Sequence, residues 1–199
     1  MIVCADMDRK MRLASNEKII NNGNYQIRAL IGDLCKYATG VTSPENVKLF
    51  QRISEELPIE LRRYASGMIF NGWLAPYSWR VEKAEVRKNG RIVFDGRSNV
   101  LGVGAYSKSF KGTMDLAELQ KHVVTNSQLP DAYIFHSMWQ YRPWNADWAL
   151  SIPYEVWKDF EPGQYEVELI THYEKGEMLV AEYHKKGRSD VTFIFNAHT

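Results

Sequence analysis

The sequence predicts an α+β fold, with two helices in the first third of the chain and mainly strands after them. Apolar residues first recur at helical spacing; an Asn-Gly turn then separates two alternating runs, and short apolar runs with glycine-containing connections fill the last third. A chain of 199 residues with 45% hydrophobic composition can form one large domain or two small ones. These features are typical of a globular protein.

Two helices are predicted near the N-terminus. The first lies within residues 24–38 and stops at Gly40, and its apolar residues fall on one stripe. The second has Ser43 as N-cap and Pro44 as its first helical residue, and it ends at Pro58. The apolar stripe of each indicates that both helices are packing elements.

A β-rich segment follows. The runs 84–87 and 91–95 flank Asn89-Gly90, which is typical of a hairpin. A further strand is predicted near residues 100–106, and a short helix over residues 115–122.

Three strands are predicted in the final third, at residues 164–170, 178–184 and 190–196. Glycine in each of the two connections favours a tight turn. The run 191–195 is apolar almost throughout, which is typical of a central strand covered on both faces. The sequence ends four residues later without helices that would cover this strand, so an exposed apolar face is expected.

Composition makes two classes of partner unfavourable. Twenty-five basic and 24 acidic residues leave a net charge of +1, which provides no long-range attraction to nucleic acid or to an anionic membrane. Apolar runs are far shorter than a membrane helix requires. The N-terminal residues do not follow the order of a secretory signal, so a cytoplasmic location is predicted. Cys4 and Cys35 are interpreted as free thiols.

Local motifs of three common enzyme classes are absent: the Gly-x-Ser-x-Gly elbow, the glycine-rich phosphate loop and the His-Glu-x-x-His pair. His172-Tyr173-Glu174 superficially resembles a zinc-ligand pattern, but the preferred interpretation is an exposed turn pair. The remaining histidines considered have no metal-like spacing and are interpreted as surface or hydrogen-bonded residues: His122, His136 and His184.

Four aromatic residues crowd one irregular segment: Trp139, Tyr141, Trp144 and Trp148. Such a group either fills a small β core or forms a platform for a peptide or a sugar, and the core is the preferred alternative. Partial exposure of at least one ring among the first three is predicted, because their neighbours suit a surface loop.

One longer stretch carries a resemblance to a known family. The element Trp73-Leu74-Ala75-Pro76-Tyr77-Ser78-Trp79 has the pattern Trp-x-x-Pro-x-x-Trp, and it lies between matching residues 64–72 and 81–86. In this region the chain resembles bacterial aminopeptidase-like proteins, a family described as a domain of unknown function in the zinc aminopeptidase superfamily. Later stretches agree in order, and the resemblance covers nearly everything after about Tyr25. The matching stretches are residues 99–107, 115–119, 130–134, 163–167 and 187–189.

The resemblance implies a zinc-peptidase-type α/β domain interrupted by a β-rich inserted domain. Residues 1–64 would form the helical start of the aminopeptidase-like domain, residues 65–162 the insert, and residues 163–199 the first strands of the central sheet. It also implies zinc as cofactor in the complete family members and a peptide or aminoacyl substrate. His198 matches a position in or just before the family's metal-ligand segment, and no residue of this chain matches a catalytic group.

The sequence therefore predicts the N-terminal part of an aminopeptidase-like hydrolase that binds no zinc and is not catalytic alone, since a catalytic zinc generally takes three protein ligands. Trp73, Pro76 and Trp79 are predicted to be structural. Two alternatives remain. The β-rich insert could be a peptide- or carbohydrate-binding module that uses the aromatic segment, or it could be a surface for homo-oligomerisation.

Overall fold

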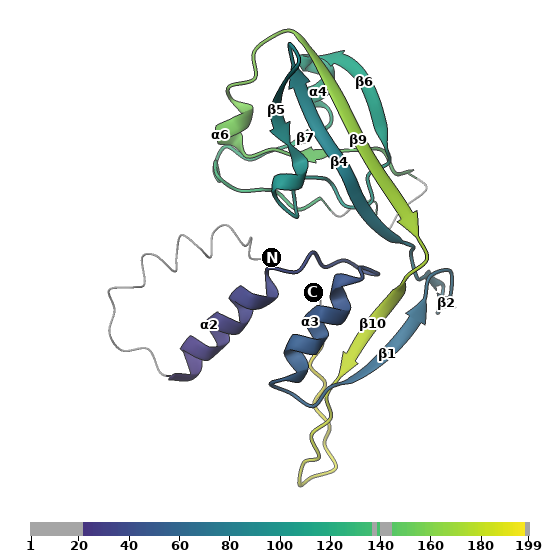
Figure 1. Cartoon of the computed structure of the whole chain (residues 1–199). Helices are drawn as coiled ribbons and strands as arrows, with labels where there is room; N and C mark the ends of the chain where they lie inside the picture. The colour runs from purple at the N-terminus through teal and green to yellow at the C-terminus, as the bar shows by residue number, and fades with distance from the viewer. Residues whose placement is uncertain (1–21, 137–138, 140–144, 198–199) are drawn as a thin grey trace. The chain divides into compact units, whose positions relative to one another are not determined.

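A computed structural model describes residues 22–136, 139 and 145–197 (Figure 1). It contains helices and small, mainly antiparallel sheets, which confirms the predicted α+β class. The described residues form two compact units: unit 1 contains residues 79–173, and unit 2 contains residues 22–78 and 174–197. No helix in the described ranges is long and apolar enough to cross a membrane.

Unit 1 is built on a four-stranded sheet with the strand order β5-β4-β9-β6. Its strands are β4 (Ser78–Lys88), β5 (Arg91–Asp95), β6 (Phe110–Asp115) and β9 (Gln164–Glu174). The predicted hairpin is confirmed, because β4 pairs with β5 across Asn89 and Gly90, both of which have positive φ. Strand β6 is antiparallel to β9, and Figure 1 shows β9 running opposite to β4.

One face of this sheet is buried and the other is exposed. Along β9, Tyr165, Val167 and Leu169 are buried, whereas the glutamates between them point away from the core. This alternation is typical of an antiparallel sheet that packs on one side only. The core continues across β4, β5 and the segments that cover the sheet, with Ala84, Val86, Phe94, Val103, Leu119, Trp148, Leu150 and Ile152.

Short elements cover the buried face of the sheet. Helix α4 (Leu116–Gln120) confirms the predicted short helix, and the Asp115 carboxylate caps it by accepting the Glu118 N–H at 2.9 Å. Strands β7 (Val123–Val124) and β8 (Leu150–Ser151) pair in parallel. They are accompanied by the 3-10 turn η2 (Gly96–Ser98) and by helix α6 (Tyr154–Trp157).

The predicted strand near residues 100–106 is wrong. The chain forms turns there, with an isolated bridge from Val103 to Leu150. Gly102 packs so closely on Gly96 that an added Cβ would lie 2.1 Å from the Gly96 carbonyl oxygen, and Tyr106 has φ +63°. A tight backbone approach and a left-handed residue are incompatible with an extended strand.

Unit 2 contains α2 (Asn22–Leu34), α3 (Glu45–Ser54), β1 (Glu60–Ala65) and β10 (Glu177–Glu182). The second helix begins one residue later than predicted, with Pro44 at the N-cap position. The capping interaction predicted for Ser43 is nevertheless present: its hydroxyl accepts the Glu45 N–H at 3.2 Å and donates to the Ala38 carbonyl at 2.6 Å, and Pro44 already has helical dihedral angles.

Strands β1 and β10 form an antiparallel pair in unit 2, with Glu60 opposite Glu182. Leu49 and Phe50 of α3 form a small core with Leu179 of β10. A second hairpin joins β2 (Ile69–Phe70) to β3 (Trp73–Leu74).

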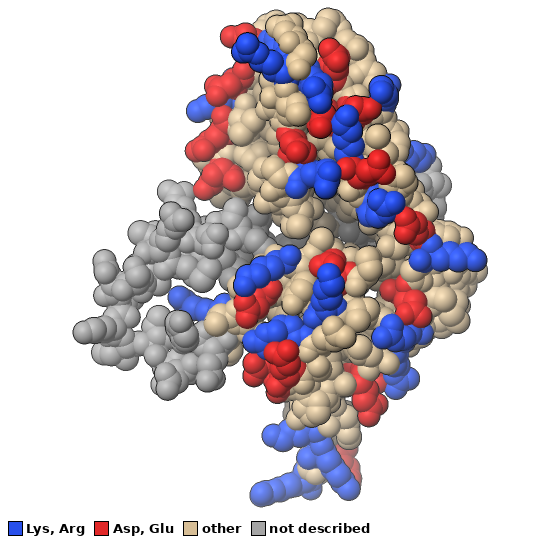
Figure 2. Space-filling model, viewed as in Figure 1, with Lys and Arg blue, Asp and Glu red and all other residues tan. Residues whose placement is uncertain are grey.

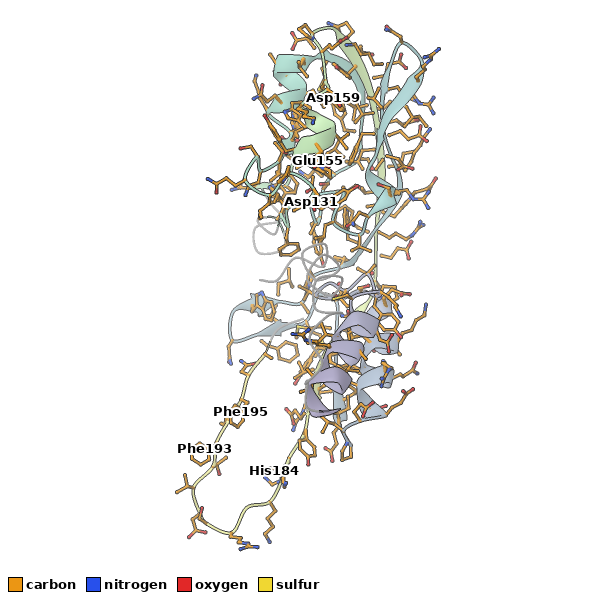
Figure 3. All side chains as sticks on the ribbon, turned by 90° about the vertical axis from the view of Figure 1, so that its left-hand side faces the viewer. Asp131, Glu155, Asp159, His184, Phe193 and Phe195 are labelled. Atoms are coloured by element: carbon orange, nitrogen blue, oxygen red, sulfur yellow. The ribbon has the colours of Figure 1, made fainter. Side chains whose placement is uncertain are left out.

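The predicted strand at residues 190–196 does not form, although the strand predicted at 178–184 is present as β10. In the described chain this C-terminal segment pairs with no strand, and its apolar side chains are exposed, with Phe195 94% accessible. Figure 3 shows Phe193 and Phe195 on one arm of a loop that projects from the rest of unit 2, with His184 on the other arm. A strand needs a neighbour for its backbone hydrogen bonds, and the described residues supply none here.

Candidate functional site

Trp148 is a core residue of unit 1. Its side chain is 4% exposed, with the His122 ring stacked on it at 4.0 Å and the Phe110 ring at 4.7 Å. The His122 Nδ1 also lies 3.0 Å from the Trp148 carbonyl oxygen. Of the two roles considered for the aromatic segment, core and ligand platform, Trp148 therefore has the first, because neither face of its ring is open to a ligand.

Trp139 is partly exposed, as expected for at least one ring of the aromatic segment. Its ring lies 4.4 Å from that of His136. Burial lowers the pKa of His136, and its Nδ1 has no hydrogen-bond partner among the described residues. Tyr141 and Trp144 lie outside the described residues. Among the described rings of this segment, Trp139 is the one that is partly exposed.

The Trp-x-x-Pro-x-x-Trp element has one exposed and one partly buried indole. Trp73 in β3 is 44% exposed, whereas Pro76 is partly buried. Trp79 begins the part of β4 that belongs to unit 1. Its Nε1 donates to the Ser107 carbonyl at 2.9 Å, and its ring stacks near Tyr106 at 6.0 Å. The local contacts of Trp79 are those of a packing residue.

His172 lies within β9 and does not form the exposed turn pair expected from the sequence, since β9 extends to Glu174. Its Nε2 is 2.5 Å from the Glu82 carboxylate of β4. Tyr173 donates its hydroxyl to the Tyr106 carbonyl at 2.6 Å, and burial raises the pKa of Tyr173 to about 12. The His172–Glu82 pair joins residues 90 positions apart, so only strand pairing reveals it.

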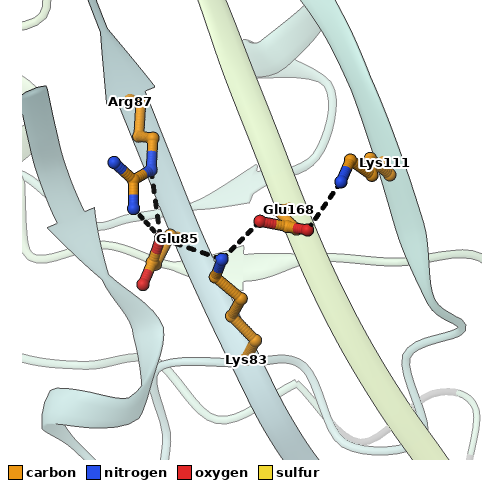
Figure 4. A network of polar contacts seen from close by, with 5 residues as sticks. All are labelled: Lys83, Glu85, Arg87, Lys111 and Glu168. Carbon is orange, nitrogen blue, oxygen red and sulfur yellow. Dashed lines mark hydrogen bonds and ion pairs between the residues drawn. The ribbon is translucent and has the colours of Figure 1, made fainter. Parts of the chain in front are cut away.

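A row of charged side chains occupies the exposed face of the sheet (Figure 4). Glu168 of β9 accepts hydrogen bonds from Lys111 of β6, at 2.8 Å, and from Lys83 of β4. On β4, Arg87 pairs with Glu85 at 2.5 Å. The hydrogen bond from Lys111, followed by that from Lys83, lowers the pKa of Glu168 to about 2. This row connects the three strands β4, β6 and β9.

We expect Glu168 to contribute to the acid sensitivity of unit 1. Its pKa is depressed in the folded chain, so its stabilising contribution is complete above its ordinary pKa of 4.5 and is lost as pH falls towards about 2. Glu168→Gln should therefore show a smaller fall in thermal midpoint across that range than the parent. Glu166→Gln, on the same strand, should behave like the parent. Identical pH profiles for the Glu168 variant and the parent would contradict the assignment.

The predicted ligand His198 lies outside the described residues. Within the described ranges, no group of three or more His, Cys, Asp or Glu side chains is arranged to hold a metal ion.

Unit 1 contains a hollow of about 390 Å³ beside α6. Its lining combines apolar and aromatic residues with acidic ones and a lysine. The sequence offered only a weak signal for it, the close spacing of Glu155, Asp159 and Glu161 around Phe160. The full lining is Lys88, Val93, Glu155, Val156, Asp159, Phe160, Glu161 and Tyr165.

A comparison with known families agrees with the limits of unit 1. Residues 78–172 match the family described as a domain of unknown function, DUF2172. A solved structure of a "putative peptidase" from Clostridium acetobutylicum is similar over 90% of this chain, with a TM-score of 0.68 and 24% sequence identity. The chain spans 40% of the length of that protein. No curated protein matches the sequence.

Proposed function

We propose that this chain forms the N-terminal part of a zinc-dependent, peptidase-type hydrolase that acts on peptide or aminoacyl substrates. In this proposal the residues of unit 2 belong to the peptidase domain and unit 1 forms the insert, so β9 is a strand of the insert and not of the central sheet. The structural likeness to the Clostridium protein carries the proposal, because it extends over 90% of this chain but only 40% of that one.

The division of the chain supports an insertion. Unit 2 is discontinuous in sequence, and unit 1 occupies the interval between its two parts. An inserted domain is a compact unit, and both of its ends connect to the domain that it interrupts. Unit 1 has this arrangement with respect to unit 2. The family match over residues 78–172 falls on the same interval.

The exposed C-terminal segment supports the idea that further residues of the proposed protein cover it. Phe193, Ile194 and Phe195 are between 80% and 94% exposed. A run of large apolar side chains at this exposure marks a surface that is normally covered. In the proposed protein, this segment would pair with further strands and be covered by helices.

The expected chemistry follows from the number of zinc ligands. His198 is the one family-matched donor in the sequence, and a hydrolytic zinc generally requires three protein ligands and an open position for water. Zinc titrated into the purified 199-residue chain should therefore bind no better than to a surface histidine, and aminoacyl-anilide hydrolysis should be absent. His198→Ala should leave both results unchanged.

The complementary experiment reads the gene beyond Thr199 and expresses the longer product. This product should bind zinc and hydrolyse aminoacyl substrates, and it should be less prone to association. Stoichiometric, tight zinc binding with turnover in the 199-residue chain would overturn the proposal. It would mean that residues such as His172 and Glu174 build the site.

A second candidate function is a peptide- or carbohydrate-binding module, favoured by the partial exposure of Trp139. Quenching of Trp139 fluorescence by a peptide or an oligosaccharide, lost in Trp139→Ala, would favour this alternative. Homo-oligomerisation through unit 1 would instead appear as a concentration-dependent mass that substitutions at the C-terminal segment do not change.

A further inference from the structure

Strand β10 of unit 2 pairs with β1 along one edge and is open along the other. Beside this pair, the Ser66 N–H donates to the Gly176 carbonyl at 2.9 Å. Bonded and non-bonded residue pairs alternate along an antiparallel ladder, so the backbone groups of Val180 bond to β1. The backbone N–H and C=O groups of Leu179 and Ala181 therefore point to the other edge. No strand of the described chain pairs with β10 there.

Charged side chains protect the outer edge of β1 but not the open edge of β10. Three of the six residues of β1 are charged. In β10 the charges are confined to the two ends, Glu177 and Glu182, and each of these glutamates already pairs with an arginine of β1 at 2.8 Å. In Figure 2, acidic and basic side chains lie together where Figure 1 draws β1. Folded proteins usually protect open sheet edges with charge, so the apolar run 178–181 leaves β10 ready to accept a strand.

Residues 191–195 have the complementary property, a strand-like sequence without a neighbouring strand. Their large apolar side chains are between 66% and 94% exposed, and no charged residue occurs from Val191 to Ala197. The segment is about as long as β10, and it lies on the loop that projects from the rest of unit 2 (Figure 3). Both its backbone groups and its side chains would gain from pairing with an apolar edge.

We propose that the open edge of β10 binds residues 191–195 of a second copy of this chain by strand addition. The added strand would complete the backbone hydrogen bonds of Leu179 and Ala181 and lie beside Val180, which is 37% exposed. Each copy has one donor segment and one acceptor edge, so two copies can exchange strands around a two-fold axis and form a closed dimer. In its own chain the segment does not pair with β10, which leaves this edge to the second copy.

This inference concerns unit 2 alone and goes beyond the proposed hydrolase. It requires neither zinc nor turnover, so it succeeds or fails independently of the proposed function. It also differs from homo-oligomerisation through unit 1, because both the donor and the acceptor belong to unit 2.

The first test is amide hydrogen exchange of the 199-residue chain, followed by NMR at a low and at a high protein concentration. The amides of Leu179 and Ala181 should exchange at least about tenfold more slowly at the high concentration, because a hydrogen bond to the added strand protects them. The amide of Arg63 is the internal control. It points to the outer edge of β1, and its exchange should not depend on concentration.

The second test compares two alanine-to-proline variants by sedimentation at several concentrations. Ala181→Pro removes an N–H from the open edge of β10 and keeps the groups that bond to β1, and it should weaken association by at least about tenfold. Ala65→Pro makes the same change at the outer edge of β1 and should associate like the parent. Circular dichroism checks that both variants are folded.

Equal weakening by the two proline variants would overturn the proposal, as would association without slower exchange at Ala181. Slow exchange at Ala181 that does not depend on concentration would mean that the segment pairs within its own chain, which also contradicts a second copy as the partner.

Discussion

Replacing Trp148 by alanine is expected to lower the free energy of unfolding of unit 1 by about 3–5 kcal/mol, the usual cost of truncating a buried aromatic residue. The side chain is 4% exposed, and the rings of Phe110 and His122 stack on it. Its removal leaves a cavity that these two rings line and cannot fill. Chemical denaturation followed by circular dichroism measures the loss.

Two variants make this result interpretable. Trp148→Phe keeps an aromatic ring in place and should cost clearly less than the alanine variant. Trp73→Ala removes an indole that is 44% exposed, and it should change stability little. Superimposable unfolding curves for Trp148→Ala and the parent would show that Trp148 does not lie in the core.

The purified chain is expected to self-associate through its C-terminal apolar segment, and Phe193→Lys combined with Phe195→Lys should weaken this association by at least about tenfold. Burial of a large apolar side chain is worth about 1.5–3 kcal/mol, and about 1.4 kcal/mol corresponds to a factor of ten in affinity. The two phenylalanines are 80% and 94% exposed in the described structure. Sedimentation at several concentrations measures the change.

A charge control separates this effect from general repulsion. Leu57→Lys introduces a lysine at another exposed apolar residue of unit 2, where the parent side chain is 44% accessible. This variant should associate like the parent. Equal dissociation by the Leu57 variant, or a monomeric parent at all concentrations, would contradict a role for the segment.

Local sequence signals determined the elements that depend on neighbouring residues. The Asn89-Gly90 hairpin forms because both residues adopt positive φ, which this dipeptide tolerates at low cost. Helix α4 begins where Asp115 can cap it. Helix α3 forms where apolar residues recur at helical spacing. These interactions span only a few residues, so a single sequence contains all the information that they need.

Only the tertiary structure decided which long-range partners each segment has. Residues 191–195 have strand-like composition but no strand to pair with in the described chain, and residues 100–106 turn because Gly96 and Gly102 pack in contact. The pairing of His172 with Glu82 depends on the register between β9 and β4. The hollow beside α6 likewise joins side chains from β4, β5, α6 and β9. Burial and pairing of this kind are properties of the assembled sheet, and for that reason the aromatic segment could be divided between core and surface only after the position of Trp148 was known.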